Sequence, residues 1–581
     1  MGLLGFCSSD EKENKMAEEE EKEPLLEASP APQGGFRTMP FIAGNLALMG
    51  MANCGLTPNM ILYLMREYRM DMATGSNVLY WWNAASNITP VVAALMADSF
   101  VGRFQMISIG SVINLLGILL FWLTTILPQA RPPPCTEANT ICPSASVLQL
   151  LLLYLSFILI SIGSGGVKSS SLAFGVDQLK NIQKNERAMD SYFGCYYAVN
   201  MVSVLVSMTC LVYIQENMGW EIGFGILALL MLFATIFILL GSPFYVRSKP
   251  KGSLITGLVQ VIVAFYRKRN LVIPSDNEDF VAYHHQGTMI CSPSETLRFL
   301  NKACIIEDPQ QDIKSDGKAS DPWSLCTVEQ VEELKACLKV IPIWATGVLM
   351  NINVNQGTFS TLQATTMNRH IGSSSTSFQI PTGSLGIFSY VSIITWLVLD
   401  DRIIRRHLHF SPKARMGSGI FLSFLCIVAS ALVEAFRRNL AIKEGFSETP
   451  EGIVDMSILW IIPQSFLGGV AEGLNAVAQN RFYISEFPQS MWSIASNFLG
   501  LGMAVASMLA SCLMNLVNEV SKGWEGGSWI SSNINKGHYD YYNWVLAGLS
   551  VVNLLLFFFC SRAYGPCREE RKVKGDIEVE S

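Results

Sequence analysis

Twelve stretches of mostly apolar residues alternate with polar segments along the chain. Each stretch is close to the ~20 residues that a helix needs to cross ~30 Å of hydrocarbon. They cover residues 40–65, 77–97, 104–127, 147–175, 191–214, 220–245, 339–363, 379–399, 417–437, 455–484, 491–517 and 541–562. A long polar segment separates the first six from the last six. The pattern predicts an all-α membrane protein with 12 transmembrane helices in two six-helix halves.

The polar segments divide the chain into five parts. We expect a disordered acidic tail over residues 1–37, a six-helix bundle over 38–245, a linker over 246–338, a second bundle over 339–562 and a second tail over 563–581. The linker is not expected to fold as a domain. Thr327 and Gln330 form a capping-box pattern, which predicts a helix that leads into the seventh span.

Lys and Arg are concentrated in the segments that share a side with the N-terminus. Basic residues favour the cytoplasmic side of a membrane, so we expect the linker and both termini to be cytoplasmic. The plasma membrane is the expected location. An acidic dileucine pattern, Glu-Lys-Glu-Pro-Leu-Leu at residues 21–26, keeps the vacuolar membrane as an alternative.

Composition narrows the class of protein. The chain is 50% hydrophobic and only 15% charged, whereas soluble proteins carry about a quarter charged residues. Acidic residues outnumber basic ones by 47 to 41, which argues against a nucleic-acid partner. No His/Cys cluster suggests a metal, and no phosphate-binding loop or nucleophile elbow suggests an enzyme or a cofactor.

Two of the 14 cysteines stand apart from the apolar stretches. Cys135 and Cys142 lie in a polar, proline-rich loop that is predicted to face outward. An oxidising compartment would favour a disulfide between them, and two free thiols are the alternative.

Five segments carry distinctive motifs: residues 98–103 (Asp-Ser-Phe-Val-Gly-Arg), 163–178 (beginning Gly-Ser-Gly-Gly-Val-Lys), 192–200, 462–472 and 531–541. They resemble signatures of the proton-coupled oligopeptide transporter family of the major facilitator superfamily, and the last is similar to its plant nitrate/peptide transporter branch. The resemblance covers roughly residues 35–560. It implies the major facilitator fold and secondary transport of a small solute.

The first span departs from this family pattern. The family's Glu-x-x-Glu-Arg/Lys motif follows Gly-Asn, but here Gly44 and Asn45 are followed by Leu-Ala-Leu-Met-Gly. Ser169 replaces a proline of the fourth helix, and Arg481 stands at an acidic position of the tenth. These changes put proton coupling in doubt. The loss of two acids and one base also favours an anionic or neutral substrate over a peptide.

Lys168 and Glu472 are the two charged residues expected deep within the membrane. A charge there costs a few kcal/mol, so each is a functional candidate. The resemblance implies that both line the substrate cavity, one from each half. A structural ion pair between them is the alternative. If protons are coupled, Glu472 is the expected carrier.

Other polar and aromatic residues within the spans complete the predicted substrate site, with hydrogen bonds between helices as the alternative role for each. They are Asn83, Asn87, Tyr197, Asn200, Asn353, Gln356, Trp460 and Asn475. Asp98 and Arg103, at the cytoplasmic ends of spans 2 and 3, are expected to hold the inner gate rather than to bind substrate.

The leading function is therefore a secondary transporter that works by alternating access between the two halves. The substrates that the resemblance allows are nitrate, organic anions, glycosides such as glucosinolates, and plant hormones. A proton-independent facilitator and a non-transporting nutrient sensor are the alternatives. The expected partners are a small solute, the lipid bilayer and, if transport is coupled, protons; the oligomeric state is left open.

Overall fold

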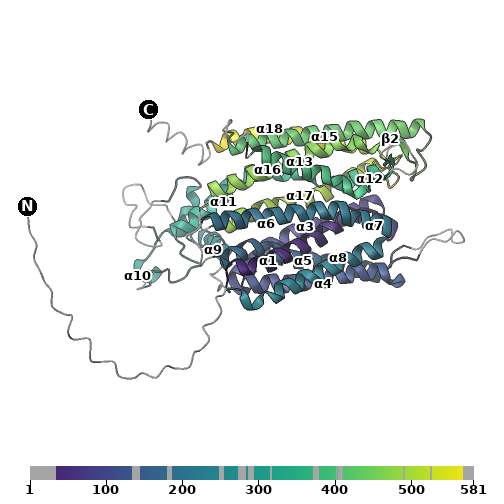
Figure 1. Cartoon of the computed structure of the whole chain (residues 1–581). Helices are drawn as coiled ribbons and strands as arrows, with labels where there is room; N and C mark the ends of the chain where they lie inside the picture. Colours follow the sequence, from purple (N-terminus) through teal and green to yellow (C-terminus); the bar gives the residue numbers. More distant parts are fainter. Residues whose placement is uncertain are drawn as a thin grey trace, which may run out of the picture.

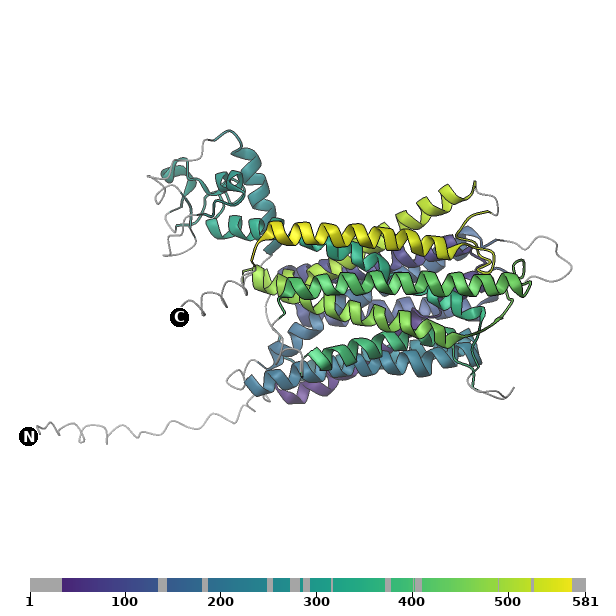
Figure 2. The ribbon, with the colours of Figure 1, turned by 90° about the horizontal axis from the view of Figure 1, so that it is seen from above.

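Long helices run side by side in a single bundle in the computed structural model (Figures 1 and 2). The structure describes residues 34–133, 144–179, 186–247, 254–271, 283–285, 293–314, 317–370, 378–400, 402, 410–488, 491–523 and 527–566. Cys135, Cys142, the dileucine pattern and most of both predicted tails lie outside these residues.

The first half of the bundle comprises eight helical segments that make up six spans. They are α1 (Met39–Leu56), α2 (Met60–Arg66), α3 (Met72–Met96), α4 (Arg103–Ile126), α5 (Val147–Gln178), α6 (Glu186–Val206), α7 (Val212–Met218) and α8 (Trp220–Leu240). A π-helical turn at Ala97–Val101 extends α3, and another at Ser207–Leu211 joins α6 to α7.

The second half repeats this layout. Its helices are α11 (Val328–Val354), α12 (Gly357–Thr365), α13 (Gly386–Leu399), α15 (Pro412–Lys443), α16 (Ile462–Glu486), α17 (Trp492–Ser521) and α18 (Tyr539–Tyr564). The short strands β1 (Met367–Asn368) and β2 (Val454–Ser457) pair in parallel. The linker contains α9 (Leu254–Arg267) and α10 (Pro309–Asp312).

Twelve spans are confirmed. In the described part of the chain, 11 helical stretches are long and apolar enough to cross a membrane. The twelfth, α16, has 25 residues but is less apolar because it carries Gln464, Glu472 and Asn475. The protein is thus a multi-pass membrane protein.

The ends of the bundle differ in what they carry. The linker helix α9 and the end of α18 lie at one end, called the linker end, and the two short strands lie at the other, called the far end (Figure 1). The N-terminal side of α1 is also at the linker end, because the amide of Gly35 donates to the carbonyl of Gln178 at the end of α5. That the linker end is cytoplasmic stays a prediction.

Small residues let α4 and α5 pack closely. A Cβ atom on Gly163 would lie 2.3 Å from the backbone nitrogen of Asn114, and one on Gly110 would lie 2.8 Å from the carbonyl oxygen of Gly163. Contacts this close between helices require glycine. The glycines of the 163–166 motif therefore hold α5 against its neighbours and fix the position of Lys168.

Part of the linker packs around a buried apolar cluster in its described residues. Val261 and Ala264 of α9 pack against Leu300, Cys304 and the start of α11 in a buried apolar cluster. Burial raises the pKa of the Cys304 thiol to about 12. The predicted capping box is confirmed, because Thr327 caps α11 and Gln330 completes the reciprocal pair.

A buried ion pair in α15 places two further charges inside the protein. Glu434 and Arg437 are both 0% exposed, and their side chains are 2.7 Å apart. Arg437 also donates to Asn535 in the loop before α18 at 2.6 Å, and Gln363 donates to Glu434 at 2.9 Å. Because each charge is paired and hydrogen-bonded, this cluster joins α12, α15 and the 531–541 loop rigidly.

Candidate functional site

A cavity of about 470 Å³ lies between the two halves. We call it the central cavity. The first half contributes residues from α2, α3 and the π-helical turn between α6 and α7, and the second half contributes residues from α11, α12, α13, α16 and α17. The polar and aromatic lining includes Trp82, Asn83, Asn87, Asn351, Asn355, Ser389, Tyr390 and Glu472. Since both halves form its walls, a movement of one half against the other would change the cavity's access.

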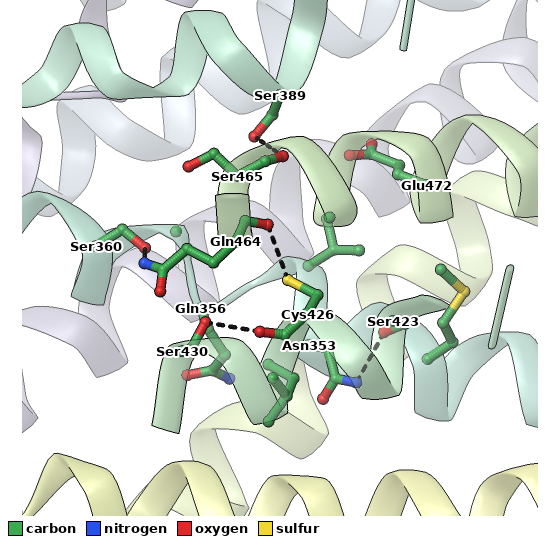
Figure 3. A pocket seen from close by; sticks show the side chains of 15 residues that line it. Asn353, Gln356, Ser360, Ser389, Ser423, Cys426, Ser430, Gln464, Ser465 and Glu472 are labelled. Atoms are coloured by element: carbon green, nitrogen blue, oxygen red, sulfur yellow. Dashed lines mark hydrogen bonds between the residues drawn. The ribbon is translucent and has the colours of Figure 1, made fainter. Parts of the chain in front are cut away.

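A smaller pocket of about 120 Å³ adjoins the central cavity within the second half (Figure 3). We call it the side pocket. Ser360, Ser389, Ser465 and Glu472 line both spaces. The two spaces are therefore continuous, and Glu472 lies where they meet.

Lys168 and Glu472 stand on opposite halves and do not form an ion pair in this structure. Lys168 has an exposed side chain on α5 and makes no hydrogen bond or ion pair with any described residue. Cys54 of α1 lies within electrostatic range of Lys168, and Tyr390 lies within range of both Cys54 and Glu472. Cys54 and Tyr390 therefore lie between Lys168 and Glu472 in this series of electrostatic neighbours.

Glu472 lines both spaces, whereas Lys168 is not among the residues that line either of them. Four further predicted residues do line these spaces. Asn83 and Asn87 lie one helical turn apart on α3 and face the central cavity, whereas Asn353 of α11 and Gln356, which caps the start of α12, face the side pocket. Asn353 also forms hydrogen bonds between helices, which was the alternative role for these residues. It donates to Ser423 of α15 and to Ser550 of α18, both at 2.9 Å.

The other four predicted residues do not line either space. Tyr197 and Trp460 are each 56% exposed on the bundle surface, which suits an aromatic side chain beside lipid. Asn200 donates to the carbonyl of Tyr196 on its own helix. Asn475 is buried where α16 packs closely on Gly419 of α15. None of the four lines the central cavity or the side pocket in this structure, and their part in substrate binding stays a prediction.

Asp98 and Arg103 form an ion pair at 3.2 Å, at the linker end of the first half. Arg103 also pairs with Asp177, near the end of α5, at 2.9 Å. A corresponding pair joins the second half, where Arg415 at the start of α15 lies 2.6 Å from Asp400 at the end of α13. The sequence reading missed Asp177, Asp400 and Arg415, because their partners lie in other helices.

Apolar packing occupies the part of α1 where the family motif would place charges. Leu46 is 4% exposed and Met49 is 2% exposed. A Cβ on Gly50 would lie 3.2 Å from the side chain of Ser203 on α6. The described part of α1 therefore offers Lys168 no carboxylate.

Polar contacts between the halves close the far end. Asn77 of α3 donates to Asn515 of α17 at 2.5 Å and accepts from Ser511 of the same helix at 2.7 Å. Glu216 of α7 forms an ion pair with Arg369 and accepts from the amide of Thr382 at 3.0 Å. The far end is thus held shut by contacts to α17, to Arg369 after β1 and to Thr382 before α13.

Reversing one charge of the Glu216–Arg369 pair should open the far end. In Glu216→Arg two cations face each other, and because the pair is partly exposed we expect a cost of about 1 kcal/mol, a roughly fivefold shift in population. Nitroxide amino acids at Val147 and Leu459, both exposed, would report longer distances between the halves. The double exchange Glu216→Arg with Arg369→Glu is the control and should restore the native distances. Unchanged distances in the single variant would show that the Glu216–Arg369 pair does not hold the far end shut.

Comparison with known sequences places the chain among transport proteins. A profile of the POT family, PTR2, matches residues 104–530. The chain is 49% identical over 567 residues to Protein NRT1/PTR FAMILY 1.2 of Arabidopsis thaliana, covering 95% of this chain and 93% of that protein. It is also 49% identical over 547 residues to NRT1/PTR FAMILY 1.1 of the same plant, covering 92% of each.

Solved structures show the same fold. An auto-inhibited POT family peptide transporter matches with a TM-score of 0.64 at 17% identity, covering 90% of this chain and 97% of that one. The POT family transporter PepTSo matches with a TM-score of 0.63 at 16% identity, covering 91% and 98%. The all-α fold with two six-helix halves, predicted from sequence, is confirmed.

Proposed function

Because the chain belongs to the POT family of membrane transporters and is a close relative of plant NRT1/PTR proteins, we propose that it is a secondary transporter of a small solute that works by alternating access. One observation carries the proposal. The central cavity has walls from both halves, and the described polar contacts between the halves gather at the far end. This is the arrangement expected when access is from the linker end.

Lys168 supports an anionic group on the solute. Its ammonium has no ion-pair partner among the described residues, and the neighbouring part of α1 is apolar. A cation within a membrane span is costly unless an anion compensates it, and the exposed side chain of Lys168 can be reached by a solute anion. Nitrate, an organic anion, an anionic glycoside or the carboxylate of a peptide would satisfy this need.

Uptake in oocytes tests the function. Cells expressing the chain would be offered nitrate, a dipeptide, a glycoside and a plant hormone, each with and without an inward proton gradient. Accumulation above the external concentration supports coupled transport, and equilibration supports facilitation. Binding without uptake would overturn the transport proposal in favour of a nutrient sensor.

A proton-independent facilitator is the second candidate, because the described part of α1 carries no carboxylate. If coupling does occur, Glu472 is the residue that supports it best: no other carboxylate lines the described part of either space. Protonation at acidic external pH would neutralise Glu472, and return to the neutral cytoplasm would release the proton.

Glu472→Gln should therefore flatten the pH response of uptake. In the native protein a drop from neutral to mildly acidic external pH is expected to raise uptake severalfold, because more Glu472 is protonated. The amide cannot titrate, so uptake by the variant should be the same at both pH values. Glu519→Gln, which alters an exposed carboxylate, is the control; a native pH response in Glu472→Gln would contradict this role.

The ion pairs at the linker end support a gating role. Asp98, Arg103 and Asp177 tie together the ends of α3, α4 and α5. We place this end in the cytoplasm, in keeping with the charge bias of the sequence. The first half would then move as one unit when the cavity opens or closes there.

A further inference from the structure

The 531–541 loop joins the two halves at the far end. On the first half, the backbone amide of Met72, the first residue of α3, donates to the Ser532 hydroxyl at 3.0 Å. On the second half, Arg438 Nε of α15 donates to the carbonyl of Gly537 at 3.0 Å. The loop is therefore held from both sides, and a change in its position would alter how the far end closes.

His538 follows these contacts, immediately before α18, and its ring accepts a hydrogen bond. Arg438 Nη2 lies 2.9 Å from His538 Nε2. A guanidinium group only donates, so Nε2 carries no proton and the ring is the neutral imidazole with its proton on Nδ1. The ring of Tyr541 stacks on it with 4.7 Å between centroids and 12° between planes. The contact with Arg438 therefore requires an uncharged histidine.

A carboxylate lies on the other side of the same ring. Asp540 Oδ1 is 3.8 Å from His538 Nδ1, and neither atom has a hydrogen-bond partner in the described structure. That separation is beyond hydrogen-bond length, so the neutral ring does not engage Asp540. A protonated ring donates from both nitrogens and is attracted to a carboxylate. Protonation would therefore exchange Arg438 for Asp540 as the partner of the ring.

The surroundings of His538 determine which form the closed arrangement holds. Arg438 and Asp540 are the charged groups within electrostatic range of the ring, and the Lys536–Glu448 pair of the same loop is exposed. Partial burial and then Arg438 lower the pKa of His538 below its ordinary value, while Asp540 acts in the opposite direction. The closed arrangement is therefore fully stable above the ordinary histidine pKa, and it loses stability as the pH falls below that value.

We propose that His538 is a pH-sensitive switch that loosens the far end in acid. A proton on Nε2 removes the acceptor of Arg438, sets two cations beside each other and turns the ring towards Asp540. The loop then withdraws from Arg438, and the contact between Ser532 and Met72 weakens. This inference rests on the proposed alternating access, and it adds a step at which acid favours opening of the far end.

Distances between the halves test the proposal. The full-length protein would carry nitroxide amino acids at Val147 and Leu459 and would be studied in lipid nanodiscs without solute. Glu472→Gln would be present throughout, so that Glu472 cannot titrate. Between neutral pH and about pH 5, we expect the ratio of open to closed molecules to rise about tenfold, because a hydrogen bond from a charged group is lost. Identical distance distributions at both pH values would overturn the proposal.

A variant without a titratable ring locates the effect. The amide oxygen of His538→Gln can accept from Arg438 but cannot take up a proton, so this variant should stay closed at both pH values. His370→Gln is the control, because it removes another histidine of the far end, next to Arg369, and should leave the acid response unchanged. Acid opening in His538→Gln would contradict the switch.

Asp540→Asn separates the switch from a merely structural contact. The carboxylate favours the charged ring, so its loss should move the midpoint of opening to lower pH by about half a unit. A residue that only holds the loop in place would change the population of the open state without moving this midpoint. An unchanged midpoint would therefore overturn the exchange of partners.

The outcomes for the switch and for the transport function are distinguishable. If proteoliposomes take up a solute while the distances do not respond to acid, the transport function stands and the switch fails. If the distances respond as expected but no solute is taken up, the switch stands and the transport function fails. The mildly acidic step used for uptake by Glu472→Gln leaves His538 largely neutral, because the pKa of His538 is below its ordinary value.

Discussion

Lys168→Gln is expected to reduce uptake of an anionic solute by roughly 10- to 100-fold. A hydrogen bond to a charged group contributes about 1.5–3 kcal/mol, and Lys168 has no described acidic neighbour that would compensate its charge before the solute arrives. The solute anion is therefore the proposed counter-charge, and glutamine cannot supply the missing ammonium.

Uptake rates over a range of solute concentrations would measure the effect. Lys168→Arg keeps the charge and should retain part of the activity, whereas the glutamine variant should not. Lys522→Gln makes the same chemical change at an exposed lysine paired with Glu519 and should transport normally. Native uptake of every anionic solute by Lys168→Gln would show that the cation does not bind substrate.

The membrane-spanning architecture could be predicted because it depends on patterns local in sequence. A stretch of about 20 apolar residues must be helical in lipid, since every backbone group has to be paired within the segment. The capping box at Thr327 and Gln330 is likewise local, and the structure has it where it was expected. These features can be predicted without knowing which helices lie beside them.

The faces of the helices could not be predicted in the same way. Asn83 and Asn475 are both amides within apolar spans, yet Asn83 lines the central cavity and Asn475 is buried against α15. The difference depends on which helix packs against each face. Trp460 lines neither space, and its position could not be predicted for the same reason, because an aromatic residue suits a cavity or a lipid-facing surface equally well.

The sequence did not indicate that the serines of the side pocket would line a pocket. A serine in a membrane helix can bond to a carbonyl of its own helix, as Ser430 does with Cys426 at 3.0 Å. Only the assembly of α11, α12, α13, α15 and α16 brings such serines together. Glu434 and Arg437 were overlooked because they lie at the end of an apolar stretch, where charges are normally solvated.

The central claim is that the two halves separate at the far end during each transport cycle. Asn77 of α3 and Asn515 of α17 contact each other there, with 2.5 Å between their side-chain nitrogen and oxygen. A covalent link between these positions would hold the far end shut. Transport would then stop, although the fold and the central cavity would be unchanged.

The most direct measurement is uptake by Asn77→Cys/Asn515→Cys before and after a short, reducible bis-thiol cross-linker, in proteoliposomes. We predict nearly complete loss of uptake on cross-linking and recovery after reduction, with both single variants unaffected by the reagent. Undiminished uptake in protein that is fully cross-linked would contradict alternating access between the two halves.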